Sequence, residues 1–180
     1  MTEQYEAIVI KSQDTKEFDK TIYLLTTTGI LICTLVGVKK PGAKLKMAAL
    51  PLSYGEFSLE MPYKRVSGFA MQTDFSALSN DYDAFVLASI ACECALISAY
   101  LDNDTARLQQ GLLYTLNNLL TYLQNTQPEQ MIQTLTEFIF FVLAISGYSK
   151  QKKYTLRTII QEFEYIFETE LKSAKLLSNL

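Results

Sequence analysis

The chain has 180 residues, of which 49% are hydrophobic and 19% charged, and its formal net charge is −3. This composition excludes a disordered chain and a protein coated in positive charge, although a local basic surface remains compatible with it. The chain has no histidine and three cysteines, which excludes Ser–His–Asp and Cys–His triads and any zinc site that needs imidazole. The odd cysteine count and the lack of a signal-peptide pattern favour a reducing cytoplasm.

The first 76 residues have the pattern of five short strands. Apolar and β-branched runs are separated by turn residues, as at Gly29, which lies between two such runs. The expected strands are 6–11, 19–27, 30–36, 52–61 and 66–73. Five strands with a longer connection after the third give the element order of an OB-fold barrel, and an SH3-like barrel would give a similar string. We therefore expect an OB-fold domain over residues 1–76.

From residue 77 the apolar residues recur at helical spacing, which predicts an all-helical bundle domain over 77–180. Asn80 or Ser79 is expected to cap the first helix and Asp104 the second. Pro128 suits the first residue of a third helix, which Gly147 terminates. The expected helices are about 80–101, 105–124, 128–146 and 154–177.

No segment is expected to span a membrane. The most apolar run, 138–146, is well short of the roughly 20 residues that a spanning helix needs. The longer run, 84–100, carries Glu93 in its middle. Both runs are expected to be buried core helices.

A basic segment follows the third expected strand, and two further cations occupy the last hairpin turn. The six side chains concerned are Lys39, Lys40, Lys44, Lys46, Lys64 and Arg65. Loops of a small barrel can bind phosphates while aromatic side chains stack on bases, and the candidate aromatics are Tyr23, Tyr54, Phe57, Tyr63 and Phe69. The alternative is a solvated lysine loop, with core aromatics behind it, that keeps a sheet edge soluble. The pattern alone favours neither.

A second basic set surrounds the expected break between the third and fourth helices, directly after an aromatic helical face. Its cations are Lys150, Lys152, Lys153 and Arg157. A basic rim beside an apolar face suits an acidic peptide with an apolar end. The alternative is that these cations compensate the C-terminal end of the third helix.

No group of residues in the sequence has a catalytic pattern. The carboxylate pairs, such as Asp81 with Asp83, are spaced by two and point to different faces of a helix. Cys92 and Cys94 have the same spacing and suit core positions better than a metal site. Glycine-rich phosphate loops are also absent. We therefore expect no enzyme, no metal, no cofactor and no small-molecule substrate.

Six short motifs follow one another along the chain. They are an apolar strand with a polar stretch at 8–20, a Thr–Gly hairpin at 25–31, a basic loop at 36–44, a Leu–Pro entry at 48–52, a Gly–Tyr-ended helix at 137–148, and a Leu–Lys–Ser close at 171–177. Their order resembles the RecO family of bacterial recombination mediators. The chain would be a short member, without the four-cysteine zinc module that many members carry after the Gly–Tyr.

The resemblance implies an N-terminal OB-fold, a helical C-terminal domain and no enzymatic turnover. It implies binding of single- and double-stranded DNA, annealing of complementary strands, and help in loading recombinase onto DNA coated by single-strand binding protein. The implied partners are RecR and that coating protein, and the implied location is the cytoplasm, at the nucleoid.

Carried to this chain, the resemblance makes the six cations of the loop and the hairpin the candidate DNA contacts. The acidic, Phe-ended tail of single-strand binding protein would bind at a helix-junction set, which comprises Phe141, Ile145, Tyr148, Lys150, Lys152, Lys153 and Arg157. The alternative function is that of a protein-interaction adaptor whose barrel does not bind DNA usefully. The net charge of −3 and the missing module favour that alternative.

Overall fold

The computed structural model describes residues 1–101, 106–125, 128–148 and 154–179. Within them the first half forms five strands: β1 (Thr2–Asp14), β2 (Lys20–Thr26), β3 (Gly29–Leu35), β4 (Tyr54–Glu60) and β5 (Arg65–Thr73). The second half forms four α-helices: α1 (Tyr82–Leu101), α2 (Ala106–Asn125), α3 (Pro128–Ile145) and α4 (Leu156–Ile166). Three short 3₁₀ turns complete it: η1 (Met47–Ala49), η2 (Ser76–Asn80) and η3 (Ser173–Asn179). A five-stranded sheet followed by four helices is what the sequence predicts.

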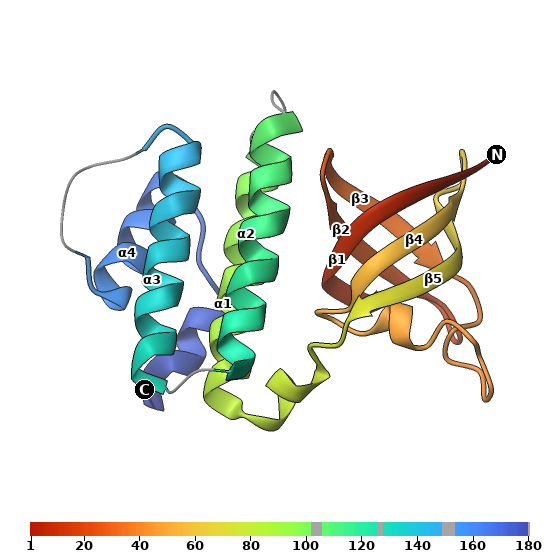
Figure 1. Cartoon of the computed structure of the whole chain (residues 1–180), viewed down its shortest axis with the longest axis horizontal. Helices are drawn as coiled ribbons and strands as arrows, with labels where there is room; N and C mark the ends of the chain where they lie inside the picture. Colours follow the sequence, from red (N-terminus) through yellow and green to blue (C-terminus); the bar gives the residue numbers. More distant parts are fainter. Residues whose placement is uncertain (102–105, 126–127, 149–153, 180) are drawn as a thin grey trace.

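The five strands close into a barrel in the order β1-β2-β3-β5-β4 (Figure 1). The long β1 makes this possible, because its first half pairs with β4 and its second half with β2. The two pairings overlap at Ala7 and Ile8, and a register shift between Val9 and Lys11 follows within the β1–β2 ladder. β3 and β5 meet in a short parallel contact at Thr34 and Arg65. Alternate residues of the strands fill the interior, where Phe57 and Leu59 are fully buried.

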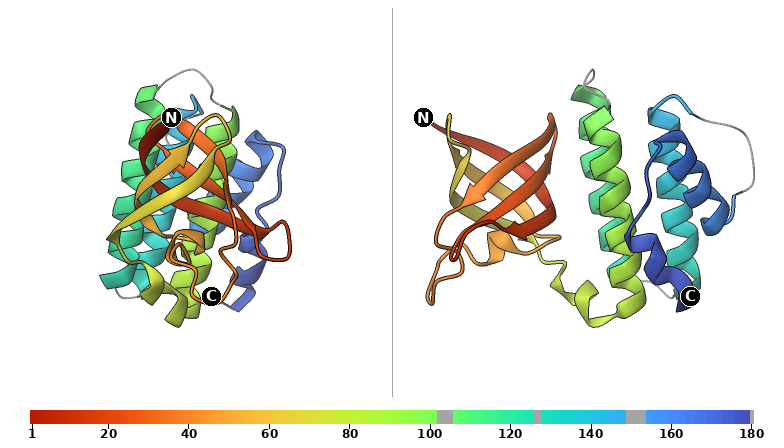
Figure 2. Two further views of the ribbon diagram at one scale, coloured as in Figure 1. Left: turned by 90° about the vertical axis from the view of Figure 1, so that its right-hand side faces the viewer. Right: turned by 180° about the vertical axis from the view of Figure 1, so that it is seen from behind.

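A second hydrophobic cluster joins the outside of the barrel to the helices. It combines the barrel residues Ile8, Leu25 and Tyr54 with the buried faces of the four α-helices. α1 and α2 are the helices that contact β1, β2 and β3, and α3 and α4 lie on the far side of them (Figures 1 and 2). The helices therefore cover one side of the barrel and leave the opposite end open to solvent.

α1 is the one described helix that is long and apolar enough to cross a membrane, over Tyr82–Tyr100. Of that stretch, 61% is buried inside the protein. α1 packs against α2, α3 and the barrel strands, so its apolar surface is used within the fold, as expected for a core helix.

Two expectations about helix ends are wrong. Asp81, and not Asn80 or Ser79, caps α1, because its Oδ1 accepts hydrogen bonds from the backbone N–H groups of residues 83 and 84 at 3.0 and 3.1 Å. α4 ends at Ile166 instead of continuing to about residue 177. The chain reverses through Glu168, whose φ is +48°, and the turn returns the buried Leu171 to the helical core.

Gly147 ends α3 as expected, with a φ of +84° and the N–H of Tyr148 donating to the carbonyl of Leu143 at 2.8 Å. The expected cap at Asp104 lies outside the described residues.

The three cysteines are buried, Cys33 in the barrel and the other two in α1. Burial raises the pKa of Cys33 to about 11, although nearby Lys64 opposes the shift, and burial followed by the charge of Glu93 raises the pKa of Cys92 to about 12. The pKa of Cys94 is raised for the same two reasons. The thiols are therefore neutral and shielded near neutral pH, and they suit core packing.

We expect the native protein to resist thiol-reactive reagents at pH 8 and to react at three thiols after unfolding. A thiol pKa raised on folding stabilises the native state below the ordinary value of 9.0, and this contribution is lost as the pH rises towards 11 and 12. Thiol titration with and without denaturant, and thermal melts between pH 8 and 11, measure both effects. Rapid stoichiometric modification of the native protein would contradict the burial.

Candidate nucleic-acid interface

The basic loop, residues 36–46, follows β3 at the end of the barrel that points away from the helices (Figures 1 and 2). Gly37 and Gly42 have φ values of +65° and +75°, so the segment folds as consecutive turns. Val38 is 3% exposed and anchors the loop in the barrel core. The four lysine residues of the loop, Lys39, Lys40, Lys44 and Lys46, are exposed. The structure therefore gathers these four predicted cations on one open end of the barrel.

The turn between β1 and β2 packs against the basic loop. The N–H of Lys39 donates to the carbonyl of Phe18 at 3.0 Å, and the N–H of Gly37 donates to Asp19 Oδ1 at 2.7 Å. The ammonium group of Lys40 lies 5.4 Å from the centre of the Phe18 ring. The two segments thus form a single surface, and Phe18, which is 38% exposed, belongs to it.

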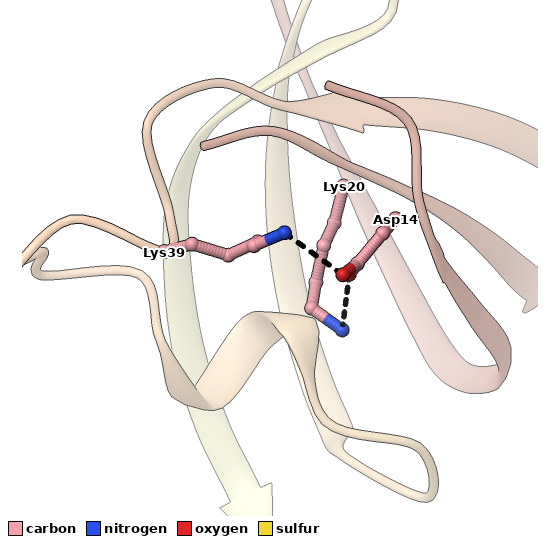
Figure 3. A network of polar contacts seen from close by, with 3 residues as sticks. All are labelled: Asp14, Lys20 and Lys39. Carbon is pink, nitrogen blue, oxygen red and sulfur yellow. Dashed lines mark hydrogen bonds and ion pairs between the residues drawn. The ribbon is translucent and has the colours of Figure 1, made fainter. Parts of the chain in front are cut away.

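A three-residue ion-pair cluster lies on this surface (Figure 3). Asp14 Oδ2 is 2.8 Å from Lys39 Nζ, and Asp14 Oδ1 is 3.2 Å from Lys20 Nζ. Hydrogen bonds from Lys39 and then Lys20 hold the pKa of Asp14 below its ordinary value, so the carboxylate is charged near neutral pH. The sequence shows no carboxylate close to the loop lysines, but the fold brings this one from 25 residues upstream.

Lys64 and Arg65, here called the hairpin pair, lie where the chain turns from β4 into β5. The carbonyl of Lys64 accepts a hydrogen bond from the N–H of Thr34 at 3.0 Å. Strand register places Thr21 of β2 opposite Thr34 of β3, and Thr34 opposite Arg65 of β5. Thr21, Thr34 and Arg65 therefore form a row across β2, β3 and β5. Two interstrand spacings, about 10 Å, separate Thr21 from Arg65. Since Lys20 directly precedes Thr21, the row connects the hairpin pair to the ion-pair cluster.

The expected aromatic platform is wrong for two of its five members. Phe57 is 0% exposed and lies inside the barrel, and Tyr54 is 6% exposed and donates a hydrogen bond to Glu6 under the helices. Phe69 is half-buried with its ring centre 4.5 Å from that of Phe57. Phe57 occupies an inward-pointing strand position, whereas Tyr54 points outward and is buried by the helices, and these two placements explain the error.

One of the five aromatic side chains is open to a ligand. Tyr63, beside the hairpin pair, is 83% exposed. Tyr23 is half-buried, with the ammonium group of Lys11 5.1 Å from its ring centre.

The described members of the helix-junction set do not share one pocket. Phe141 lines a cleft of about 550 Å³ between α2 and α3. Tyr148 lines a second cavity with three glutamates of the α4 region, and Arg157 lines a third between α4 and η3. Ile145 is half-buried against the helical core. Lys150, Lys152 and Lys153 lie outside the described residues.

Within the described ranges no group of three or more histidine, cysteine, aspartate or glutamate side chains is arranged to hold a metal ion. The site at the end of the barrel is instead built from lysine and arginine point charges. Such a surface binds anions by charge and needs no bound ion.

Sequence reasoning missed Asp14, Phe18 and Lys20. The pairing follows only when β1 continues to residue 14, because Asp14 and Lys20 then lie at facing ends of two consecutive strands. Asp14 and Lys20 are direct partners in the β1–β2 register.

Comparisons with known proteins agree on one family. The family model described as Recombination protein O N terminal matches residues 1–69. The chain is 28% identical over 144 residues to a DNA repair protein RecO of Clostridium perfringens, covering 78% of this chain and 56% of the relative. It is 30% identical over 168 residues to that of Clostridium kluyveri, covering 89% and 62%, and 29% identical over 99 residues to that of Clostridium novyi, covering 52% and 38%.

The chain therefore spans about three fifths or less of the length of these curated relatives. The match to the N-terminal model covers β1 to β4 and most of β5, and the longer alignments extend into the helices. The resemblance seen in the sequence is confirmed: residues 1–69 match the N-terminal RecO family model, and most of the chain is similar to DNA repair proteins named RecO.

Proposed function

We propose that this chain is a non-enzymatic DNA-binding protein of DNA repair and recombination, which holds single-stranded DNA by its phosphates at the open end of the barrel. The observation that carries the proposal is the joint surface of the basic loop, Lys20 and the hairpin pair, on the part of the barrel that the helices leave uncovered. The relatives, which are named DNA repair protein RecO, support the same process.

The barrel is inferred to be of the OB type. Its strand order and its parallel contact between β3 and β5 support this assignment. In OB-folds, oligonucleotides bind on strands 2 and 3, between the loop that joins strands 1 and 2 and the loop that joins strands 4 and 5. With the barrel over residues 1–76 and the helical bundle over 77–180, the proposal is one DNA-binding domain and one helical domain.

The helices restrict where DNA can lie on the barrel. Leu25 of β2 is fully buried, and Ile30 of β3 packs against the same helical cluster. The remaining part of the β2–β3 face, with Thr21, Thr34 and the 44% exposed Ile32, lies between the basic loop and the hairpin pair. We assign the DNA path to this strip.

Binding on such a surface is expected to tolerate sequence. Lysine side chains act as point charges on phosphate oxygens and do not offer the bidentate geometry that distinguishes bases. Exposed Tyr63 and Phe18 add faces on which any base can stack. Binding to the DNA backbone without preference for base sequence suits a protein that acts on DNA of any sequence.

The finer steps of the proposal rest on the family. They are binding of double-stranded as well as single-stranded DNA, annealing of complementary strands, and assistance in loading recombinase onto DNA coated by single-strand binding protein. RecR and the coating protein are the proposed partners, and the cytoplasm, at the nucleoid, is the proposed location.

Capture of the acidic tail of single-strand binding protein by the helical half is a further part of the proposal. Among the described members of the helix-junction set, exposed Arg157 supplies charge, and the apolar lining of its cavity comes from Ile160, Leu171 and Leu177 instead of Phe141 and Ile145. The cavity beside Tyr148 suits an acidic tail poorly, because Glu162, Glu164 and Glu168 also line it. The cavity that Arg157 lines also contains Glu164 and Glu170, but Arg157 and Lys175 balance their charge, so the tail is proposed to approach from the Arg157 side.

The adaptor function remains the second candidate, and one observation favours it. Asp14 neutralises part of the charge of Lys20 and Lys39, so the surface is less basic than the sequence suggests. An adaptor would use the same exposed end for a protein partner.

Fluorescence anisotropy with labelled single-stranded DNA at several salt concentrations tests the proposal. If about four phosphates are neutralised, the plot of log affinity against log salt should have a slope near −3. Binding should be similar for oligonucleotides of different sequence and equal length. Lack of binding at low salt, or affinity that does not respond to salt, would favour the adaptor.

A further inference from the structure

We propose that Lys20 and Lys39 form a phosphate subsite for single-stranded DNA, and that Asp14 occupies it in the free protein as an intramolecular stand-in for the phosphate. The inference rests on the proposed DNA binding and adds a self-competing carboxylate to it. DNA binding then includes an exchange, in which a backbone phosphate takes the place of the Asp14 carboxylate between the two ammonium groups.

The geometry of the cluster supports this exchange. The two ammonium groups converge on separate oxygens of one carboxylate, at 3.2 Å for Lys20 and 2.8 Å for Lys39 (Figure 3). A phosphodiester also presents two unesterified oxygens on one centre, so it can take up the same pair of contacts. The lysine side chains are 28% and 33% exposed, so their stems are packed while their charged ends meet at the surface.

The carboxylate itself is accessible and replaceable. The Asp14 side chain is 59% exposed, so a DNA backbone can reach it from solvent. Ion pairs at such exposure contribute little to folding stability, so replacing one anion by another costs little. The other contacts between the two loops, from the N–H groups of Gly37 and Lys39 and from Lys40 over Phe18, do not involve Asp14. The loops therefore stay docked when the carboxylate moves away.

The position of the cluster joins it to the rest of the DNA path. Asp14 pairs with Lys20 in strand register, and the next row runs through Thr21 and Thr34 to Arg65. A strand of DNA on that row would meet this subsite at one end and the hairpin pair at the other.

The test compares Asp14→Asn with Glu17→Gln. Both remove one negative charge from the same segment, and Glu17 is an exposed residue of the turn between β1 and β2. Asp14→Asn is expected to bind single-stranded DNA about two- to fivefold more tightly than wild type, the factor that release of a surface ion pair supplies. The log–log salt slope should stay close to that of wild type, because the same phosphate occupies the subsite in both proteins. Glu17→Gln frees no lysine and should therefore gain less affinity than Asp14→Asn.

A second variant checks that the gain in DNA affinity depends on the two lysines. Adding Lys39→Gln to Asp14→Asn should cancel the gain, since one half of the subsite is then missing. Inorganic phosphate at matched ionic strength separates a free-anion site from a backbone site. It should compete for DNA no better than chloride if the subsite needs the polymer.

The outcomes separate this inference from the proposed function. If wild type binds DNA with steep salt dependence but Asp14→Asn binds no more tightly than Glu17→Gln, the subsite is overturned and DNA binding stands. Weaker DNA binding and a lower melting temperature in Asp14→Asn would show that the ion pairs only hold the loops, which also overturns it. If neither wild type nor any variant binds DNA, both proposals fail.

Discussion

Replacement of Lys40, Lys44 and Lys46 together by glutamate is expected to weaken binding of single-stranded DNA about 100-fold or more. All three side chains are exposed on the basic loop, so the change removes phosphate contacts and adds repulsion. Lys39 is left in place because its ammonium group bonds to Asp14 at 2.8 Å, and a glutamate there would face that carboxylate. Anisotropy titrations measure the affinity, and circular dichroism melts report whether the barrel still folds.

A matched variant separates a local site from overall charge. Changing Arg157, Lys172 and Lys175 to glutamate lowers the net charge by the same amount, but on the helical half of the protein. It is expected to reduce DNA affinity only slightly at moderate salt, where distant charges are screened. Equal losses in both variants would point to overall charge, and unchanged binding in the loop variant would favour the adaptor.

Gly55→Ala is expected to destabilise the protein by about 3 kcal/mol or more, because overpacking against backbone has no easy relief. A Cβ at this buried position of β4 would lie 2.2 Å from the carbonyl oxygen of Ala70 and 3.0 Å from Met71 Cα, both on β5. The two strands would have to separate where their register already shifts. Thermal melting should show a fall in the midpoint of about 6–12 °C.

Gly111→Ala is the control, because it replaces a glycine by alanine at a position where the added Cβ meets no steric clash. Gly111 lies inside α2, and an added Cβ would have as its nearest neighbour Phe141 Cζ at 3.8 Å, an ordinary contact. Alanine favours a helix interior over glycine, so this variant should gain about 0.5–1 kcal/mol. A melting midpoint for Gly55→Ala equal to that of wild type would mean that β4 and β5 are not held as closely as described.

The five strands of the barrel could be predicted because each one either alternates apolar and polar residues or is a continuous apolar run, and turn residues separate them. The end of β1 could not, since Ser12, Gln13 and Asp14 are polar and carry no alternation, and the strand was expected to stop at residue 11. The ion-pair cluster depends on that end, because Asp14 reaches Lys20 and Lys39 only when β1 continues to residue 14. Part of the candidate site was therefore hidden where the pattern signal fades.

The helical half shows the same limit. Periodicity predicted four helices, but it continues past residue 166 and gives no sign of the reversal at Glu168. The sequence positions of the aromatic and basic residues in the helix-junction set also do not predict which of them line the same pocket. Phe141, Tyr148 and Arg157 line three separate cavities, because Phe141 lies in α3, Tyr148 follows the end of α3 and Arg157 lies in α4.

The shared cluster between barrel and helices has a consequence for how such chains can diverge. Ile8, Leu25 and Tyr54 lie on the outside of the barrel, yet the helices bury them as fully as interior residues. A substitution at any of these positions must be compensated by a substitution on α1 or α2, so substitutions in the barrel and in the helices should be correlated. A barrel grafted from a relative onto these helices would present an outer surface that does not fit them. The basic loop, at the opposite end of the barrel, can vary in length and charge without disturbing the packing between barrel and helices.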